Sequence, residues 1–186
     1  MTKNDQFQLS TNAAESYERQ KVPAIFAPLA EATLSSIAMP PGASVLDVAC
    51  GTGAVARAVA LRLVEPSIIT GSDLNAAMIE VALQNTPNDI HKHNFVVASA
   101  DAMPFDDSEY DLVFCQHGLQ FFPDKPAALA EIRRVMRNGG NLFVTCWAGI
   151  PPMFHVVQDV LGRHIGEAAA KSAVAPFVWN DGASIS

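Results

Sequence analysis

Two glycines and an aspartate stand where short apolar runs give way to polar residues, and their spacing suits the binding of a nucleotide-like ligand. Gly51 and Gly53 flank Thr52 in the segment DVACGTG, between the apolar run 43–49 and an alanine-rich stretch. Glycine lets a ligand approach the backbone closely, and a helix N-terminus offers unpaired N–H groups. Asp73 follows Gly53 by about 20 residues, the spacing at which a carboxylate can accept hydrogen bonds from ribose hydroxyls. A tight turn and a helix N-cap are the structural alternatives for these residues.

Three further features narrow the class of ligand. Asp47 precedes the glycines, where it would repel the pyrophosphate of a dinucleotide but would attract an ammonium group. Asp101, with Ala102, follows the third apolar run and can accept a hydrogen bond from an adenine amino group. Gln116 and His117 place polar groups after the fourth run. An ammonium, a ribose and an adenine together describe S-adenosylmethionine. GTGAVA also fits the dinucleotide pattern GxGxxG/A, so a nicotinamide-dependent oxidoreductase is the alternative enzyme.

The elements that must position these residues alternate regularly along the chain. We expect strands at 43–49, 67–73, 94–98, 110–115 and 141–147. We expect helices at 54–64, 75–84 and 125–137. Connections this long between strands require right-handed crossovers and a parallel sheet. The predicted fold class is α/β, a Rossmann-like, doubly wound, mostly parallel sheet in three αβα layers, whose ligands bind beyond the carboxyl ends of the strands.

Two segments flank this predicted core. We expect one or two lid helices over residues 10–38, broken near Pro23 and Pro28, and a further helix over 152–171. We expect Asn138, Gly139 and Gly140 to cap the end of helix 125–137. The prediction is a single domain, 1–186, with lid helices in 1–38, a cofactor-binding core in 43–150, and a C-terminal helix and incomplete tail in 151–186.

The composition excludes several classes of function. The 186 residues hold 12 Lys and Arg against 19 Asp and Glu, which gives a net charge of −7 and disfavours nucleic-acid binding. The one dense basic cluster, Arg133, Arg134 and Arg137, has helical spacing and is typical of a solvated helix face. No apolar run approaches the roughly 20 residues that span a bilayer, and the polar start lacks the apolar core of a signal peptide, so we expect a cytoplasmic protein.

Metal binding is not expected. The three cysteines lie far apart and form no CxxC pair, so the sequence predicts neither a zinc site nor a disulfide framework. His91 and His93 would share one face of a strand, but no third ligand lies near them in the sequence. We therefore expect both to be surface histidines.

The ordered series of motifs resembles the class I S-adenosylmethionine-dependent methyltransferases, and within them the type 11 group that includes the ubiquinone/menaquinone C-methyltransferases. VLDVACGTG is similar to the first motif of this family, and GSDLNAAMI to the second. ASADAMPFDDSEYDLVFCQHGLQFFPD is similar to the third and fourth, and EIRRVMRNGGNLFV to the helix–Gly-Gly–strand that follows. The resemblance covers residues 16–147. Family members usually continue with two further strands, which we do not find after residue 150.

The resemblance implies a cofactor site built from the lid and from the carboxyl ends of the strands. Asp47 would hold the methionine ammonium, Asp73 the ribose hydroxyls, and Asp101 the adenine amino group. Ala49 stands where many members of the family have glycine, a departure that adds one methyl group. The residues implied in cofactor binding are Tyr17, Asp47, Ala49, Gly51, Gly53, Asp73, Leu74, Met78, Asp101, Ala102, Gln116 and His117.

The implied reaction transfers a methyl group from S-adenosylmethionine to a small-molecule acceptor and yields S-adenosylhomocysteine. A base is needed only if the acceptor must first lose a proton, and His117 is the candidate catalytic residue, with a structural or cofactor-contacting role as its alternative. Phe105, Phe121 and Phe122 either line an apolar acceptor site or belong to the core.

Two further expectations concern the chain as a whole. Because the segment after residue 150 often completes the substrate pocket in this family, we expect the chain to keep the cofactor site without turning over at a normal rate. A non-catalytic cofactor-binding module is therefore an alternative to an enzyme. An exposed fifth strand predicts pairing between copies of the chain, as a homodimer or an aggregate.

Overall fold

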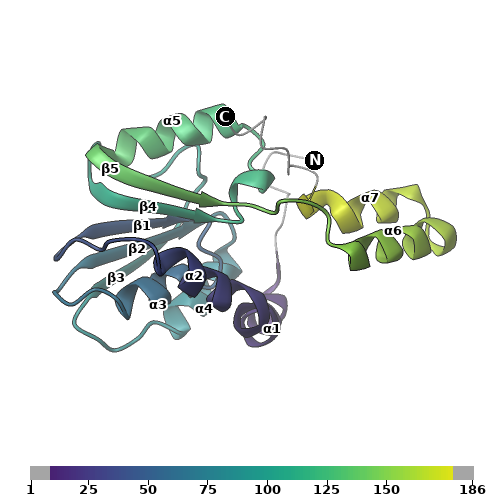
Figure 1. Cartoon of the computed structure of the whole chain (residues 1–186), viewed down its shortest axis with the longest axis horizontal. Helices are drawn as coiled ribbons and strands as arrows, with labels where there is room; N and C mark the ends of the chain where they lie inside the picture. Colours follow the sequence, from purple (N-terminus) through teal and green to yellow (C-terminus); the bar gives the residue numbers. More distant parts are fainter. Residues whose placement is uncertain (1–8, 178–186) are drawn as a thin grey trace.

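Five parallel strands form the sheet of the computed structural model, which describes residues 9–177 (Figure 1). The strands are β1 (Ser44–Val48), β2 (Ile68–Asp73), β3 (Lys92–Val97), β4 (Tyr110–Gln116) and β5 (Met136–Thr145), in the order β3-β2-β1-β4-β5. Every neighbouring pair is parallel. The chain runs outward from β1 in both directions, so β1 and β4 meet at the topological switch point where doubly wound sheets bind ligands. This confirms the predicted fold class.

Helices cover both faces of the sheet and complete the three layers. α2, α3 and α4 lie on one side and α5 on the other, whereas α1 packs against α4 (Figure 1). The bounds of these five helices are α1 (Thr11–Lys21), α2 (Ala27–Leu34), α3 (Ala54–Ala60), α4 (Ala76–Gln84) and α5 (Lys125–Val135). Within residues 9–177, each helix is too short or too polar to cross a membrane.

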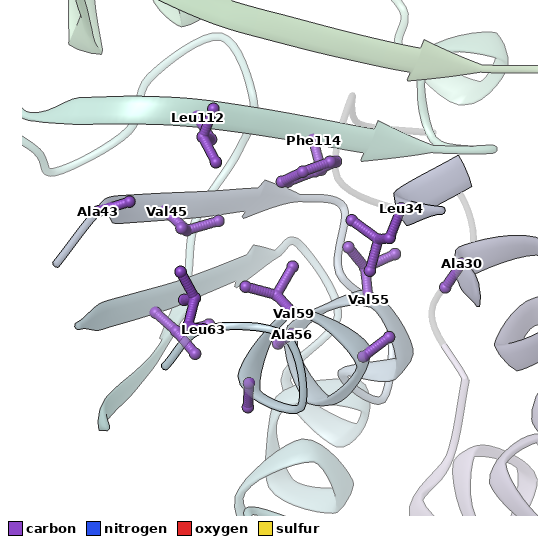
Figure 2. Close-up of a cluster of buried hydrophobic side chains, with 13 residues drawn as sticks. Ala30, Leu34, Ala43, Val45, Val55, Ala56, Val59, Leu63, Leu112 and Phe114 are labelled. Atoms are coloured by element: carbon purple, nitrogen blue, oxygen red, sulfur yellow. The ribbon is translucent and has the colours of Figure 1, made fainter. Parts of the chain in front are cut away.

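Alternating side chains of the central strands fill two cores. Val45 of β1 and Phe114 of β4 point to the α3 side, where they pack with Val59 (Figure 2). Leu46 of β1 packs on the opposite side with Ile132 of α5. Because both faces of β1 are buried, its sequence is apolar throughout apart from Ser44 and Asp47, and this makes the strand recognisable from sequence alone.

The N-terminal segment forms two α-helices, and the break predicted near Pro23 and Pro28 takes the form of a π-helical turn between them. Between α1 and α2 lies one wide π-helical turn, η1 (Val22–Phe26), in which Ala27 N–H donates to the carbonyl of Val22. Pro23 lies at the start of this turn, where its missing N–H removes no bond that the turn needs. Pro28 lies in the first turn of α2, where proline is tolerated for the same reason.

The predicted glycine cap at 138–140 is wrong, because these residues belong to β5. α5 ends at Val135, whose carbonyl accepts a hydrogen bond from Glu109 N–H at 2.8 Å, so the helix end is satisfied without a cap. The pairing of β4 with β5 shifts register between Tyr110 and Leu112. A Cβ at Gly140 would lie 2.9 Å from the carbonyl oxygen of Asp111, so glycine there permits the close approach of the two strands.

The arginines of the predicted solvated helix face are instead paired. Arg134 donates to the carbonyls of Phe105 and Met103 at 2.8 and 3.1 Å, and to the carboxylate of Asp107 at 2.7 Å. Arg137 lies in β5 and pairs with Asp111 at 2.6 Å. Residues 98–109 connect β3 to β4 without a helix, so Arg134 fixes the loop that carries Asp101.

The C-terminal part forms a hairpin of two helices, not the single predicted helix. α6 (Pro152–His164) and α7 (Glu167–Val174) are separated at Gly166, whose φ of +125° is incompatible with a continuous helix. The hairpin projects beyond the carboxyl ends of the strands (Figure 1) and leads into η3 (Ala175–Phe177). No strand follows β5 up to residue 177, and the rest of the predicted tail lies outside the described residues.

Candidate functional site

A cavity of about 470 Å³ opens at the carboxyl ends of the strands, where the sequence places the ligand. Its wall includes residues from the N-terminal segment, such as Leu9, and residues that follow β5, such as Phe154. Gly53 and Ala102 lie outside its wall, whereas Asp47 lies behind it. The predicted site residues that line this cavity are Tyr17, Ala49, Gly51, Asp73, Leu74, Met78, Asp101, Gln116 and His117.

Asp47 is a buried carboxylate without a hydrogen-bond partner. It is 1% exposed, and neither of its oxygens has a partner among the described residues. It borders a small hollow of about 30 Å³ that shares Tyr17, Gly51 and Gln116 with the main cavity. Burial, and secondarily the nearby charge of Asp73, raise the pKa of Asp47, and the backbone N–H of Ala56 only partly opposes this rise. An unpaired buried carboxylate is costly, so this position favours a cationic ligand.

Asp73 ties the end of β2 to the glycine turn. One carboxylate oxygen accepts from Gly51 N–H at 2.9 Å and the other from Asn75 N–H at 2.8 Å. Burial raises the pKa of Asp73, although these two hydrogen bonds oppose the rise. The N-cap of α4 is Asn75, whose side chain accepts from Ala77 N–H, so the N-cap alternative for Asp73 is wrong. Each oxygen keeps further lone pairs with which it can accept hydrogen bonds in the cavity.

The two glycines of the turn have different roles. Gly51 has a φ of +55° and faces the cavity, where the Tyr17 ring lies 3.9 Å from the position that a Cβ would take. Gly53 has a φ of +83° and is the N-cap residue of α3. A Cβ on Gly53 would lie 3.3 Å from the Phe95 ring of β3. Gly53 therefore shapes the turn from behind and lines neither hollow.

Two residues other than glycine adopt left-handed backbone conformations at the site. Ala49 and His117, at the ends of β1 and β4, have φ values of +57° and +54°. Such conformations are costly for residues with a Cβ and are concentrated at ligand sites. The value at Ala49 shows that glycine would suit this position, since glycine alone adopts it without strain.

The N-terminal segment covers the site through two aromatic rings and one side-chain hydrogen bond. Tyr17 of α1 stacks on Phe26 of η1 with ring centroids 5.2 Å apart, and Phe26 meets the His117 ring edge-on at 6.2 Å. The Gln116 amide donates to the Phe26 carbonyl at 3.0 Å. Burial, helped by Asp73, raises the pKa of Tyr17, so the phenol stays neutral. Gln116 thus holds the lid, a role that the sequence did not indicate.

His117 is a buried imidazole with one free ring nitrogen. It is 8% exposed, and its Nδ1 has no partner among the described residues. Its ring packs against Trp147 at 4.4 Å between centroids. Burial lowers the pKa of His117, so the imidazole is neutral near neutral pH and can accept a proton.

Aromatic side chains from distant parts of the chain form the rest of the wall. The sequence analysis assigned Phe121 and Phe122 either to an apolar acceptor site or to the core, and both line the cavity. Phe105 packs in the α5-side core against Tyr110 instead. The wall residues that sequence reasoning missed, none of which lies in a matched motif apart from Gln120, include Lys21, Ile25, Phe26, Gln120, Trp147, Phe154 and Phe177.

His93 in β3 and His91, just before that strand, are both partly buried and have polar partners, contrary to our expectation of surface residues. The His93 side chain is 6% exposed and lies 3.0 Å from the Asp89 carboxylate. His91 Nε2 lies 3.1 Å from the carbonyl of Ala60. Within residues 9–177, no group of three His, Cys, Asp or Glu side chains is arranged to hold a metal ion.

Comparison with known families identifies the matched region as a methyltransferase domain, over residues 46–144. The chain belongs to the type 11 family of class I S-adenosylmethionine-dependent methyltransferases. The methyltransferase match runs from β1 to β5 and includes every predicted site residue except Tyr17, which the lid supplies. Ala49 lies within it, at the strained position after β1.

Individual relatives agree with this family. The ubiquinone/menaquinone biosynthesis C-methyltransferase UbiE of Hahella chejuensis is 42% identical over 106 residues, which are 55% of this chain and 42% of that protein. The UbiE of Laribacter hongkongensis is 31% identical over 145 residues, which are 76% of this chain and 59% of that protein. The chain thus spans about half the length of these two methyltransferases.

A solved structure shows the same fold at lower identity. The S-adenosylmethionine-dependent methyltransferase of Aquifex aeolicus superimposes with a TM-score of 0.65 at 17% identity, over 84% of this chain and 88% of that one. This likeness supports the fold that the strand order already indicates.

Proposed function

We propose that the chain transfers a methyl group from S-adenosylmethionine to a small-molecule acceptor. The observation that carries this proposal is the buried, unpartnered carboxylate of Asp47 beside the glycine turn. An ammonium group supplies both the positive charge and the donors that such a carboxylate lacks. A dinucleotide pyrophosphate would bring further negative charge to the same place, which argues against the nicotinamide-dependent alternative.

The other cavity residues fit the remaining parts of the cofactor. Asp73 would hold the ribose hydroxyls, and Leu74 and Met78 would border the adenine. Asp101 accepts a hydrogen bond from Ser99 and keeps lone pairs for the adenine amino group. The Gly51 backbone, with Tyr17 above it, would lie along the methionine part. When bound, the cofactor supplies a methyl group activated on a sulfonium.

The protein's own contribution is positioning, exclusion of water and the handling of one proton. Gln116 holds the lid over the site through its bond to Phe26, and the aromatic wall excludes water around the acceptor. His117, neutral and with Nδ1 free, would take a proton from an acceptor that must lose one. His117 is therefore the proposed general base.

The cavity suits a small apolar acceptor better than a nucleic acid. Among the described residues that line it, Lys21 is the one Lys or Arg, and the sequence carries a net charge of −7. Nucleic-acid sites need several clustered cations to neutralise phosphates. The lining aromatic rings instead favour an uncharged molecule.

A ligand panel tests the cofactor directly. We expect S-adenosylhomocysteine and S-adenosylmethionine to raise the melting temperature, and NADH and NADPH to leave it unchanged. At 100 times the dissociation constant, a ligand adds about 2.7 kcal/mol, or roughly 5–10 °C for a chain of this size. Differential scanning fluorimetry measures this shift. A rise with NADH alone, or no rise with any of the four, would contradict the proposed cofactor.

The sheet edge formed by β5 supports a second part of the proposal, which is that two copies of the chain form a homodimer through this strand. Within residues 9–177, β5 pairs with β4 and with no other strand, so its outer N–H and C=O groups face outward. Exposed strand edges of this length favour pairing with a second chain. We expect light scattering coupled to gel filtration to give twice the chain mass. A mass of one chain at every concentration would contradict the dimer.

A further inference from the structure

The side-chain amide of Gln120 is the second unpartnered polar group of the cavity wall. Gln120 lies in η2 (Leu119–Phe121), directly after β4, and lines the cavity. Its amide nitrogen and oxygen are both buried, and neither has a hydrogen-bond partner among the described residues. A primary amide carries two donors and one acceptor, so this side chain leaves an unusual amount of hydrogen-bonding capacity unused.

The place of Gln120 in the fold separates it from the residues proposed to hold the ribose and the adenine of the cofactor. Asp73 ends β2, and Asp101 follows β3, on one side of β1 in the sheet order. Gln120 follows β4 on the other side of β1, and η2 packs against η3 of the C-terminal segment. Gln120 therefore lines the cavity near the end of β4, across β1 from Asp73 and Asp101.

The surroundings of Gln120 are aromatic. Its neighbours in the sequence, Phe121 and Phe122, line the same cavity, as do Trp147, Phe154 and Phe177. The ring of Phe177 contacts both Trp147 and Phe154, with centroids 5.3 and 4.5 Å away. A polar group placed in an otherwise apolar wall orients a ligand and discriminates between similar ones.

The backbone holds Gln120 in this position. Phe121 N–H donates to the Gly118 carbonyl at 2.9 Å and closes the short helical turn. A Cβ at Gly118 would lie 2.6 Å from the Cβ of Ala49, so the turn packs directly against the end of β1. The amide is therefore presented by a fixed element and not by a free loop.

We propose that Gln120 determines acceptor specificity by hydrogen bonding to a hydroxyl or carbonyl group of an otherwise apolar ring compound. The proposal rests on the methyl transfer proposed above, because it assigns the acceptor half of the same cavity. The amide can donate to a carbonyl or accept from a hydroxyl, and the aromatic wall takes up the apolar remainder. A compound of the same shape without the polar group would leave the buried amide unpaired and bind less tightly.

The test compares 2-naphthol with naphthalene as probes, in the presence of saturating S-adenosylhomocysteine. Wild-type protein should bind 2-naphthol about tenfold more tightly than naphthalene, the factor that one net hydrogen bond provides. Gln120→Met keeps the length of the side chain and removes its polar atoms, so it should abolish this preference. Gln84→Met, at an exposed position in α4, should keep it. Equal affinities in wild type, or a preference that survives in Gln120→Met, would overturn the proposal.

Two further measurements show whether Gln120 recognises the acceptor or only stabilises the fold. Gln120→Met should leave the melting temperature of the ligand-free protein unchanged or higher, because the native amide has no partner to lose. A large fall would show a structural amide and count against the proposal. S-adenosylhomocysteine should bind both variants as it binds wild type. If wild-type protein does not bind S-adenosylhomocysteine, the proposed cofactor is refuted. If it binds S-adenosylhomocysteine but does not prefer 2-naphthol over naphthalene, only the role of Gln120 is refuted.

Discussion

Asp47→Asn is expected to weaken binding of S-adenosylhomocysteine by about 100-fold or more while stabilising the ligand-free protein. Removing one member of a buried charge pair costs about 2–5 kcal/mol in binding. Without ligand, the same substitution removes a carboxylate that has no hydrogen-bond partner among the described residues, and asparagine keeps its shape. Isothermal titration calorimetry measures the affinity, and thermal unfolding measures the stability. The opposite signs separate loss of a ligand contact from loss of folding.

Asp159→Asn is the matched control for this substitution. Asp159 lies on α6, where its half-exposed carboxylate pairs with Arg163, and it does not line the cavity. Surface pairs of this kind contribute little, so neither affinity nor stability should change by more than about 1 kcal/mol. If Asp47→Asn binds S-adenosylhomocysteine as tightly as wild type does, Asp47 does not hold the ammonium group and the main argument for the proposed cofactor fails.

The same carboxylate gives the ligand-free protein a pH dependence of defined sign. Burial raises the pKa of Asp47 in the folded state, so between the unfolded and folded pKa values the folded protein binds the extra proton. Its contribution therefore destabilises the fold increasingly as the pH rises through that interval. Asp89, Asp111 and Glu131 have lowered pKa values, so their contributions stabilise the fold as the pH rises. These contributions are the same in wild type and in Asp47→Asn and cancel in the comparison. Urea titrations at about pH 4 and about pH 8 should show the advantage of Asp47→Asn growing with pH.

The sheet and the polar ends of its strands are largely predictable from the sequence. Strands buried on both faces, such as β1, are mainly apolar in sequence, and the carboxyl ends of parallel strands necessarily meet at one edge. Asp73 and Gln116 therefore come together as predicted. The Asn-Gly-Gly segment at 138–140 does not cap α5 as predicted, because the same residue types also suit an irregularity in a strand.

The parts of the site that the sequence could not predict depend on contacts between distant segments. Gln116 and Phe26, which hold the lid together, are 90 residues apart. Phe177 reaches the cavity from the far end of the described chain, after two helices that pack mainly on each other. No local pattern encodes such contacts. Whether the carboxylate of Asp47 is paired or unpaired also depends on all its neighbours, and residue type alone does not determine it.

The turns after β1 and β4 should behave as one packed unit, which a double-mutant cycle can measure. A Cβ on Gly118 would lie 2.6 Å from the Cβ of Ala49 and 3.0 Å from the Sγ of Cys115. Overpacking of this kind costs about 1–3 kcal/mol, so Gly118→Ala should lower the free energy of unfolding by that amount. Gly149→Ala is the control, because a Cβ there meets nothing within 4 Å.

Ala49→Gly should rescue much of this loss, because it removes the atom that a Cβ on Gly118 would contact. Alone, it exchanges left-handed strain of about 1–2 kcal/mol for a glycine entropy cost of about 0.5–1 kcal/mol, so its own effect is small. In urea unfolding, the double variant should be more stable than the sum of the single changes predicts, by about 1 kcal/mol or more. Additive effects would show that the two turns relax independently. Coupling would mean that the proposed cofactor turn after β1 and the turn that carries Gln120 hold each other in place.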